Sequence, residues 1–249
     1  MTELNEEDRE VVNTARDRGI AILPGLFDEG ELAEIRQQFS RAYIDVGKGA
    51  GEPAKRDSIS GEVLLAYPAV ADLFIHPRIL GIASAIMGTG GEKPWLWQLK
   101  TNRYTPGHSG VRKHTDGSLG ELAPPFARQA MAVFLDDIWV ESGALTYVPG
   151  SHKLHYEDEG ESQRQCPTQE EIDAGEYTPA ELKAGSVLFR VPEVWHAVNP
   201  IHHLRRYITA SYTVRGRVSP LQEERSAKVE EQRQGKEEEV LEVFREYLY

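Results

Sequence analysis

The chain has 249 residues, of which 40% are hydrophobic and 27% charged, a composition that suits one domain with elaborations. Its formal net charge of −12 argues against a nucleic-acid partner, because phosphate binding requires a basic surface. The sequence has no run of about 18 apolar residues and no apolar N-terminal leader, so we expect neither a membrane span nor a secretory signal. With a single cysteine, Cys166, an internal disulfide is excluded. We therefore expect a cytoplasmic protein that acts on a small molecule, as a monomer or a homodimer.

The first part of the chain, residues 1–93, is expected to be mostly helical. Asp28 and Glu31 form the capping box that starts one of its helices. Residues 19–27 indicate a short buried strand closed by a turn, and the Gly-, Lys- and Ser-rich residues 47–62 indicate a loop. Apolar residues at helical spacing predict helices over residues 6–18, 29–45, 63–74 and 78–87.

From residue 94 to residue 217 the pattern changes to short alternating strands separated by Gly, Pro and Asp turns. Many short strands after a helical start favour a β-barrel or sandwich with helices packed on one side. An acidic insert at 155–182, with a short helix near 168–174, interrupts the strands, and a charged helix is expected at 218–249. The predicted strands cover residues 95–104, 129–140, 143–150, 185–191 and 205–216.

His114 and Asp116 form a His-x-Asp pair in the segment VRKHTDGS. On a strand, residues two apart point the same way, so both side chains can reach one point. The pair alone is common by chance, but His196 follows another apolar strand, and a barrel brings distant strand ends together. Two histidines and one carboxylate leave three positions open on an octahedral metal, which suits non-haem iron(II). The HExxH motif of many zinc hydrolases is absent.

An arginine pair after His196 suits the carboxylate of a 2-oxo diacid. Arg205 starts the last predicted strand, and its planar guanidinium is able to clamp the far carboxylate while the keto acid chelates the metal. The adjacent Arg206 would point to the opposite face. The residues themselves leave open which of the two arginines binds.

The segment LDDIWVESGALTYVPGSHK at 135–153 resembles the signature of the phytanoyl-CoA dioxygenase family of iron(II)- and 2-oxoglutarate-dependent oxygenases. Three further blocks match in the same order: HTD at 114–116, WHAVNP at 195–200 and RRYITASY at 205–212. The resemblance covers roughly residues 16–216. It implies a mainly β fold with flanking helices around a double-stranded β-helix core, the jelly-roll arrangement of cupins.

The resemblance also implies the cofactors and the residues that hold them. Iron(II) would be bound by His114, Asp116 and His196, with 2-oxoglutarate and O2 as co-substrates. The 2-oxoglutarate-binding residues that it implies are Arg205, Gln98 and Asn102.

The family usually has an aromatic residue just before the His-x-Asp, where this chain has Lys113. This departure favours a polar or anionic substrate. His152 is expected to support the PGSHK turn, and His108 to lie at the rim of the site. From strand alternation, the candidate substrate-pocket residues are Lys100, Arg103, Lys113 and Trp195, with Arg128 and Arg190 as weaker candidates.

We therefore expect an iron(II)- and 2-oxoglutarate-dependent dioxygenase that hydroxylates a small polar or anionic metabolite and releases succinate and CO2. The carboxylate at Asp116 favours hydroxylation over halogenation, because related halogenases keep that ligand position small to admit chloride. One alternative is a cupin-like metal-binding sensor or binding protein without turnover. Another is a metal-dependent hydrolase or isomerase on the same barrel. Desaturation and ring formation stay open as reaction outcomes.

Overall fold

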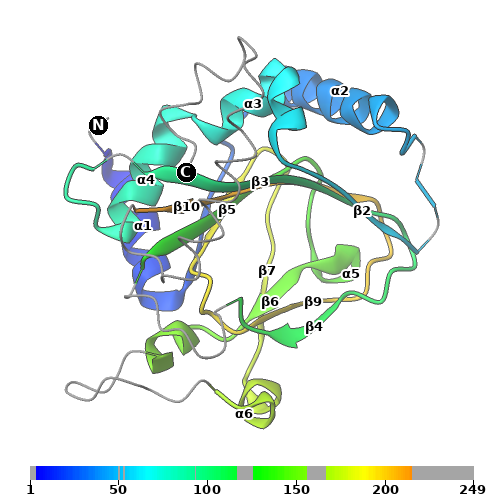
Figure 1. Ribbon diagram of the computed structural model, residues 1–249. Coiled ribbons are helices and arrows are strands. Elements are labelled where there is room, and N and C mark those ends of the chain that lie inside the picture. The colour runs from blue at the N-terminus through cyan, green and yellow to red at the C-terminus, as the bar shows by residue number, and fades with distance from the viewer. Residues whose placement is uncertain are drawn as a thin grey trace, which may run out of the picture.

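Two antiparallel sheets face each other and form the core of the protein (Figure 1). The computed structural model describes residues 4–49, 51–52, 54–92, 94–116, 126–155 and 167–214. The six-stranded sheet has the order β1 (Ile20–Leu23), β8 (Val187–Arg190), β5 (Arg128–Phe134), β10 (Arg205–Thr213), β3 (Trp95–Tyr104) and β2 (Arg56–Ser60). The four-stranded sheet has the order β4 (Val111–His114), β9 (His196–Val198), β6 (Leu145–Tyr147) and β7 (Thr178–Ala180). This arrangement confirms the expected double-stranded β-helix.

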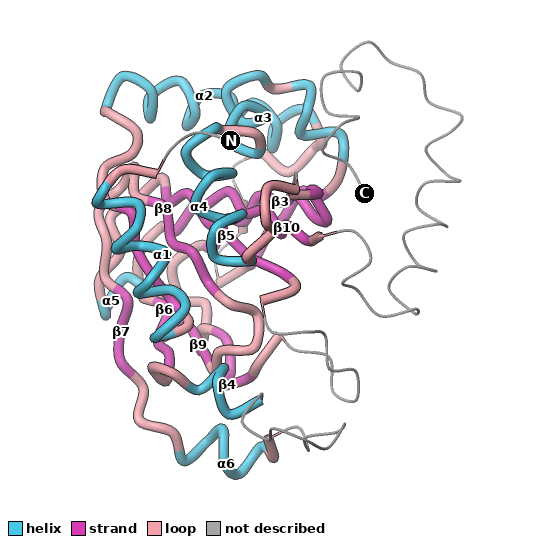
Figure 2. The backbone as a smooth tube through the Cα atoms, turned by 90° about the vertical axis from the view of Figure 1, so that its left-hand side faces the viewer, coloured by secondary structure: helices cyan, strands magenta, loops and turns pink. Residues whose placement is uncertain are grey.

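Helices cover the outer face of the large sheet, on the side away from the small sheet (Figures 1 and 2). Asn5 and Asp28 start the first two helices with the capping boxes that satisfy free N–H groups there. Gly19 ends the first helix with a φ of +84°, which favours glycine. The four long helices are α1 (Glu6–Arg18), α2 (Glu29–Asp45), α3 (Pro68–Phe74) and α4 (Pro77–Met87). The short ones are η1 (Glu62–Ala66), α5 (Val140–Gly143), η2 (Ser151–His155) and α6 (Gln169–Ala174).

The apolar core has two layers because successive strand residues face opposite sides of a sheet. Between the helices and the large sheet, Phe39 and Phe74 pack with Ile208. Between the two sheets, Phe134 and Tyr207 lie in a smaller cluster. Along β10, therefore, Tyr207 and the residues two positions away from it face the space between the sheets, where a site can form.

The stretch Pro68–Met87 is long and apolar enough to cross a membrane by length and composition alone. It is α3 and α4, which are separated at Ile75 and His76. Both helices bury side chains such as Phe74 and Ile82 in the core against the large sheet. Their hydrophobicity is therefore accounted for by packing.

Several expectations about local structure were wrong. The helix expected over 63–74 is two helices, η1 and α3, on either side of Tyr67. Residues 47–62 are not all loop, because 56–60 form the edge strand β2. Its polar sequence does not predict a strand, and the strand is formed by pairing with β3. The strand expected over 129–140 ends at Phe134, where an acidic turn follows. The charged helix expected at 218–249 lies outside the described residues, as do Cys166 and residues 156–165 of the acidic insert.

Candidate metal centre

The His114 and His196 side chains meet because their strands pair. β4 and β9 are antiparallel neighbours, and His114 lies opposite His196 in their register. β4 follows Gly110, whose φ is +85° and where a Cβ would meet the Val198 carbonyl oxygen at 2.1 Å, so only glycine fits. This close backbone approach seats β4 against β9 and brings the two imidazoles to one edge of the small sheet.

Asp116 completes a cluster of three ligand atoms that lie within 4.8 Å of one another. Its Oδ1 is 3.3 Å from His114 Nε2, and its Oδ2 is 3.9 Å from His196 Nε2. The centroids of the two imidazole rings are 4.2 Å apart. Asp116 lies just beyond β4, where its backbone N–H donates to the Pro192 carbonyl at 3.0 Å. The structure thus brings the expected triad together in a geometry that fits one metal ion.

Both histidines present Nε2 to this point because their Nδ1 atoms are occupied. His114 Nδ1 lies 2.7 Å from the Arg112 carbonyl oxygen, and His196 Nδ1 lies 2.9 Å from that of Val194. In each case the carbonyl belongs to the residue two positions earlier. A hydrogen bond from Nδ1–H to a carbonyl selects the tautomer and leaves the Nε2 lone pair free for a metal.

The charge states of Asp116 and His196 are the metal-binding forms, whereas His114 has to release a proton to bind a metal. Burial, reinforced by Arg190, lowers the pKa of His196 to about 3, so its imidazole is neutral near pH 7. Burial would raise the pKa of the Asp116 carboxyl, but Arg190 and His114 outweigh it and hold the pKa well below its usual range. The hydrogen bond to Asp116 raises the pKa of His114 against the effect of burial. A carboxylate and neutral imidazoles are the forms that coordinate a metal.

Arg205 is a buried cation that has no anionic partner within the described part of the chain. It is 2% exposed, and its Nε and Nη1 atoms have no hydrogen-bond partner. Its guanidinium carbon lies 5.4, 5.3 and 4.6 Å from the ring centroids of Tyr104, Phe134 and Tyr207. Among the described residues, no carboxylate lies within ion-pair distance of it. Because an unpaired buried charge is costly, this arrangement fits a bound anion.

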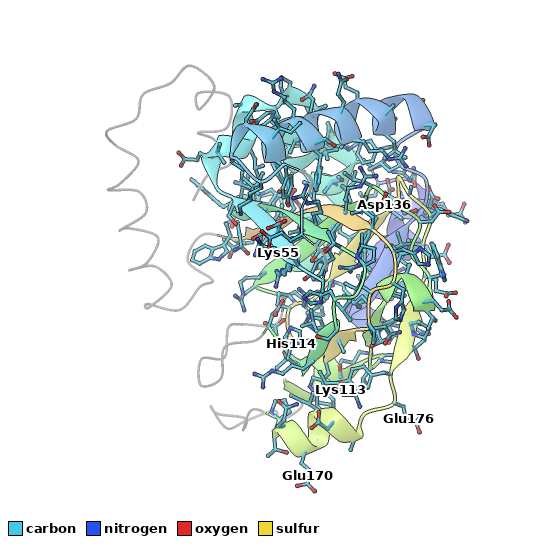
Figure 3. All side chains as sticks on the ribbon, turned by 90° about the vertical axis from the view of Figure 1, so that its right-hand side faces the viewer. Lys55, Lys113, His114, Asp136, Glu170 and Glu176 are labelled. Carbon is cyan, nitrogen blue, oxygen red and sulfur yellow. The ribbon has the colours of Figure 1, made fainter. Side chains whose placement is uncertain are left out.

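The neighbouring Arg206 points to the other face of the sheet and is neutralised there. Its Nη2 lies 2.6 Å from Asp136 Oδ1, and its Nε lies 3.1 Å from Asp136 Oδ2. Figure 3 shows Asp136 well away from His114. Of the two arginines that the sequence leaves open, Arg205 is the one with an unmatched charge between the sheets.

The face of β3 toward the small sheet carries polar side chains near Arg205. The register of β3 with β10 puts Lys100 and Asn102 on the same face as Arg205. Asn102 is buried, whereas Gln98, farther along this face, is exposed. Burial and the charge of Arg56 lower the pKa of Lys100. The structure therefore brings Lys100 and Asn102 near Arg205 and leaves Gln98 at the exposed end of the face.

Arg56 is a cation at this site that the sequence pattern does not reveal. Its Nη2 donates to Asn102 Oδ1 at 3.1 Å, and its guanidinium carbon lies 5.4 Å from the centroid of the Tyr104 ring, which Arg205 also contacts. His108 packs edge-on against the same ring at 4.9 Å, at the Arg205 end of the site. The segment RDSIS has a single apolar residue, so only its pairing with β3 shows that it is a strand.

Arg103, expected as a candidate for the substrate pocket, does not lie on this face. It follows Asn102, so it points toward the helices. Its Nη2 lies 3.0 Å from Asp57 Oδ2, and its guanidinium carbon lies 4.3 Å from the centroid of the Tyr43 ring. Its Nη1 donates to the Gly49 carbonyl oxygen, and its Nη2 also donates to that of Lys48. These contacts make Arg103 a structural residue.

Lys113 is also placed differently from the expectation. It precedes His114 on β4 and points away from it. Its Nζ donates to the Asp173 carbonyl at 2.6 Å and lies 4.5 Å from the centroid of the Tyr177 ring. Figure 3 shows Lys113 on the side of α6, which carries Glu170. Lys113 therefore holds α6 against the small sheet, and its ammonium is not directed at the triad.

The PGSHK turn bonds the residue that directly precedes the metal-site histidine His196. Ser151 Oγ accepts a hydrogen bond at 2.9 Å from the backbone N–H of Trp195, the buried residue before His196. The fully buried His152 has its Nε2 3.0 Å from the Arg16 carbonyl oxygen of α1. The expectation that His152 supports this turn is confirmed.

Fold and site together define a double-stranded β-helix protein with a His-Asp-His metal centre. The family model for phytanoyl-CoA dioxygenase (PhyH) matches residues 15–202, so the chain belongs to the phytanoyl-CoA dioxygenase family. The match includes the triad and ends before Arg205. No curated protein matches the chain by sequence.

Several solved structures share this fold. One is the non-haem α-ketoglutarate-dependent carbocyclase SnoK from nogalamycin biosynthesis, with 21% identity, coverage of 85% of this chain and 84% of that chain, and a TM-score of 0.67. The epimerase SnoN, solved with Fe3+, α-ketoglutarate and nogalamycin RO, has 23% identity, 83% coverage of both chains and a TM-score of 0.64. HygX from Streptomyces hygroscopicus, solved with nickel and 2-oxoglutarate, has 19% identity, 86% and 89% coverage and a TM-score of 0.65. At these identities the likeness shows the fold.

Proposed function

We propose that this protein is an iron(II)- and 2-oxoglutarate-dependent dioxygenase that hydroxylates a small polar or anionic metabolite, with release of succinate and CO2. The proposal rests on one observation, that a possible metal site and a buried cation with no anionic partner in the described residues occur together in this protein. The His114, Asp116 and His196 atoms fit one metal ion. The buried guanidinium of Arg205 has donors without partners and no neighbouring carboxylate among the described residues. A metal chelator with a second carboxylate satisfies both features.

Each residue of the site would have a separate role. The Nε2 atoms of His114 and His196 and one oxygen of Asp116 would hold iron(II), which when bound supplies the activation of O2. Arg205 would bind the far carboxylate of 2-oxoglutarate through charge-assisted hydrogen bonds, with Asn102 beside it. Three protein ligands leave room for the keto acid and O2 on the same metal.

The aromatic rings around Arg205 keep water from its charge. Tyr104, Phe134 and Tyr207 contact the guanidinium, so a carboxylate that binds there exchanges water for a dry, preformed cation. Electrostatic attraction is stronger in such surroundings than in water. This supports Arg205 as the residue that would hold one carboxylate of the co-substrate.

The substrate class is proposed from Lys100 and Trp195. Lys100 is half-buried on the face that Arg205 occupies, and no hydrogen bond or ion pair of its ammonium is found among the described residues. Trp195 is buried directly before His196. A polar or anionic small molecule that reaches Lys100 beside the metal fits this arrangement. Gln98, at the exposed end of the same face, is a proposed contact at the entrance. The net charge of −12 supports a role without a nucleic-acid partner.

The test is 2-oxoglutarate consumption and succinate release with iron(II) and ascorbate under air, in Arg205→Gln and in the matched control Arg206→Gln. We expect Arg205→Gln to weaken 2-oxoglutarate binding by roughly 10- to 150-fold, because it removes charge-assisted hydrogen bonding worth about 1.5 to 3 kcal/mol. Arg206→Gln changes an arginine on the other face and leaves the affinity within about twofold of wild type.

Two results would contradict the proposal. A wild-type protein that binds metal but neither binds nor consumes 2-oxoglutarate would be a metal-binding sensor. Turnover of a substrate without oxygen would indicate a metal-dependent hydrolase or isomerase. To find the substrate, each anionic metabolite is compared with its amide. Activity is measured as succinate release above the background without substrate.

A further inference from the structure

Arg190 is a cation in direct contact with the triad, through the carboxylate of Asp116. Its Nη2 lies 2.5 Å from Asp116 Oδ2, and its Nη1 lies 3.5 Å from His196 Nδ1. The arginine side chain is 15% exposed. A guanidinium at this distance is bound to the carboxylate by a charge-assisted hydrogen bond.

The backbone of Arg190 is held more firmly than that of Asp116. Arg190 ends β8, which lies between two strands, and it pairs with Ile20 on β1 and Ala130 on β5. Asp116 lies beyond the end of β4, with its side chain 45% exposed. The arginine is therefore a fixed point on the large sheet, to which a ligand on the small sheet is tied.

The contact divides the two carboxylate oxygens between different partners. Oδ2 accepts from Arg190, while Oδ1 lies 3.3 Å from His114 Nε2. A carboxylate that binds a metal through both oxygens occupies two of six octahedral positions. With two histidines, it would then leave two positions, too few for a chelating keto acid together with O2.

We propose that Arg190 is a positioning residue that engages Asp116 Oδ2 and so holds Asp116 as a ligand through one oxygen. This inference rests on the proposed function, which requires three open positions on the metal. Arginine suits the role because its charge is permanent and its planar fork fixes direction as well as distance. Partners that bind metal ligands in this way orient them and set metal affinity.

The test compares Arg190→Gln and Arg190→Lys with wild type, using Co(II) as the probe because its visible spectrum reports the number of ligands. We expect Arg190→Gln to weaken Co(II) binding by roughly 10- to 100-fold, the range found when such outer partners are lost, and to alter the spectrum. Arg190→Lys keeps the charge without the fork and loses less. The matched control Arg206→Gln, which removes a guanidinium from the outer face, keeps both affinity and spectrum.

Unchanged affinity and spectrum in both Arg190 variants would overturn the inference, because Arg190 would then only neutralise Asp116 while no metal is bound. Circular dichroism shows whether each variant is folded. If Arg190→Gln does not fold, Arg190→Lys alone is compared with wild type. Addition of 2-oxoglutarate separates the two claims. If the wild-type Co(II) spectrum does not respond to 2-oxoglutarate, the proposed function fails, even where the Arg190 variants differ from wild type in metal affinity. A wild-type protein that binds no Co(II) would overturn both.

Discussion

His152 is a neutral imidazole buried under the C-terminal end of α1, and its environment disfavours the charged form. Burial lowers its pKa from 6.5 against the opposing hydrogen bond to the Arg16 carbonyl. Its Nδ1 has no hydrogen-bond partner, so a proton there would be an uncompensated charge. The unfolded chain takes up that proton more readily than the folded protein does.

We therefore expect the free energy of unfolding to be highest above pH 6.5 and to fall as pH decreases through that value. His152→Gln, which keeps a donor for the Arg16 carbonyl, should show a flatter dependence. Urea unfolding of both proteins between pH 8 and pH 5.5, at one metal loading, measures the difference. Equal pH dependence in the two proteins would show that His152 is not responsible.

At the scale of elements, β2 depends on a buried ion pair that joins it to β3 and α2. Asp57 on β2 and Arg103 on β3 are almost fully buried, and the Tyr43 hydroxyl from α2 donates to the Asp57 carbonyl at 3.1 Å. This tie matters for the site because the same strand carries Arg56 toward Asn102. The edge strand is thus held by one face and contributes to the site with the other.

Arg103→Met is expected to destabilise the protein by up to about 3 to 5 kcal/mol, because it leaves the buried Asp57 carboxylate with Lys55, whose Nζ is 3.9 Å from its Oδ1, as its only ion-pair partner among the described residues. The double variant Arg103→Met with Asp57→Asn should recover part of that loss. Urea unfolding measures both. The affinity of the folded Arg103→Met protein for 2-oxoglutarate should stay within about twofold of wild type. A loss of co-substrate binding at full stability would restore Arg103 to the pocket.

At the scale of the whole molecule, the proposed ligands join the two sheets. The triad comes from the edge of the small sheet, where His114 pairs with His196, whereas Arg205 belongs to the large sheet. A metal chelator that reaches Arg205 therefore crosses the interior, and ligand binding should stabilise the barrel as a unit.

We expect Mn(II) to raise the melting temperature, and 2-oxoglutarate to raise it further only when Mn(II) is present. At about 100 times the dissociation constant, each ligand contributes about 2.7 kcal/mol, or roughly 5 to 10 °C for a domain of this size. In Arg205→Gln the metal increment should persist and the 2-oxoglutarate increment should disappear. Differential scanning calorimetry measures the shifts, and equal 2-oxoglutarate increments in both proteins would remove Arg205 from the site.

Local patterns in the sequence determined most of the elements and the metal ligands. The capping box at Asp28 and the apolar spacing locate helices, because these signals depend on neighbours in the chain. The His-x-Asp pair is likewise readable, since strand geometry alone makes His114 and Asp116 point the same way. His196 was inferred from its place after an apolar strand, and the family resemblance then implied the same residue.

Only the tertiary structure decided where the cations lie relative to the triad. Arg103 and Lys113 look like pocket residues in the sequence, yet Asp57 and α6 hold their charged ends elsewhere. Arg205 and Arg206 are equivalent in sequence until strand parity and Asp136 separate them. Arg190 meets Asp116 only through the packing of the two sheets. The physical reason is that the partner of a charge is set by contacts between distant segments, which no local pattern encodes.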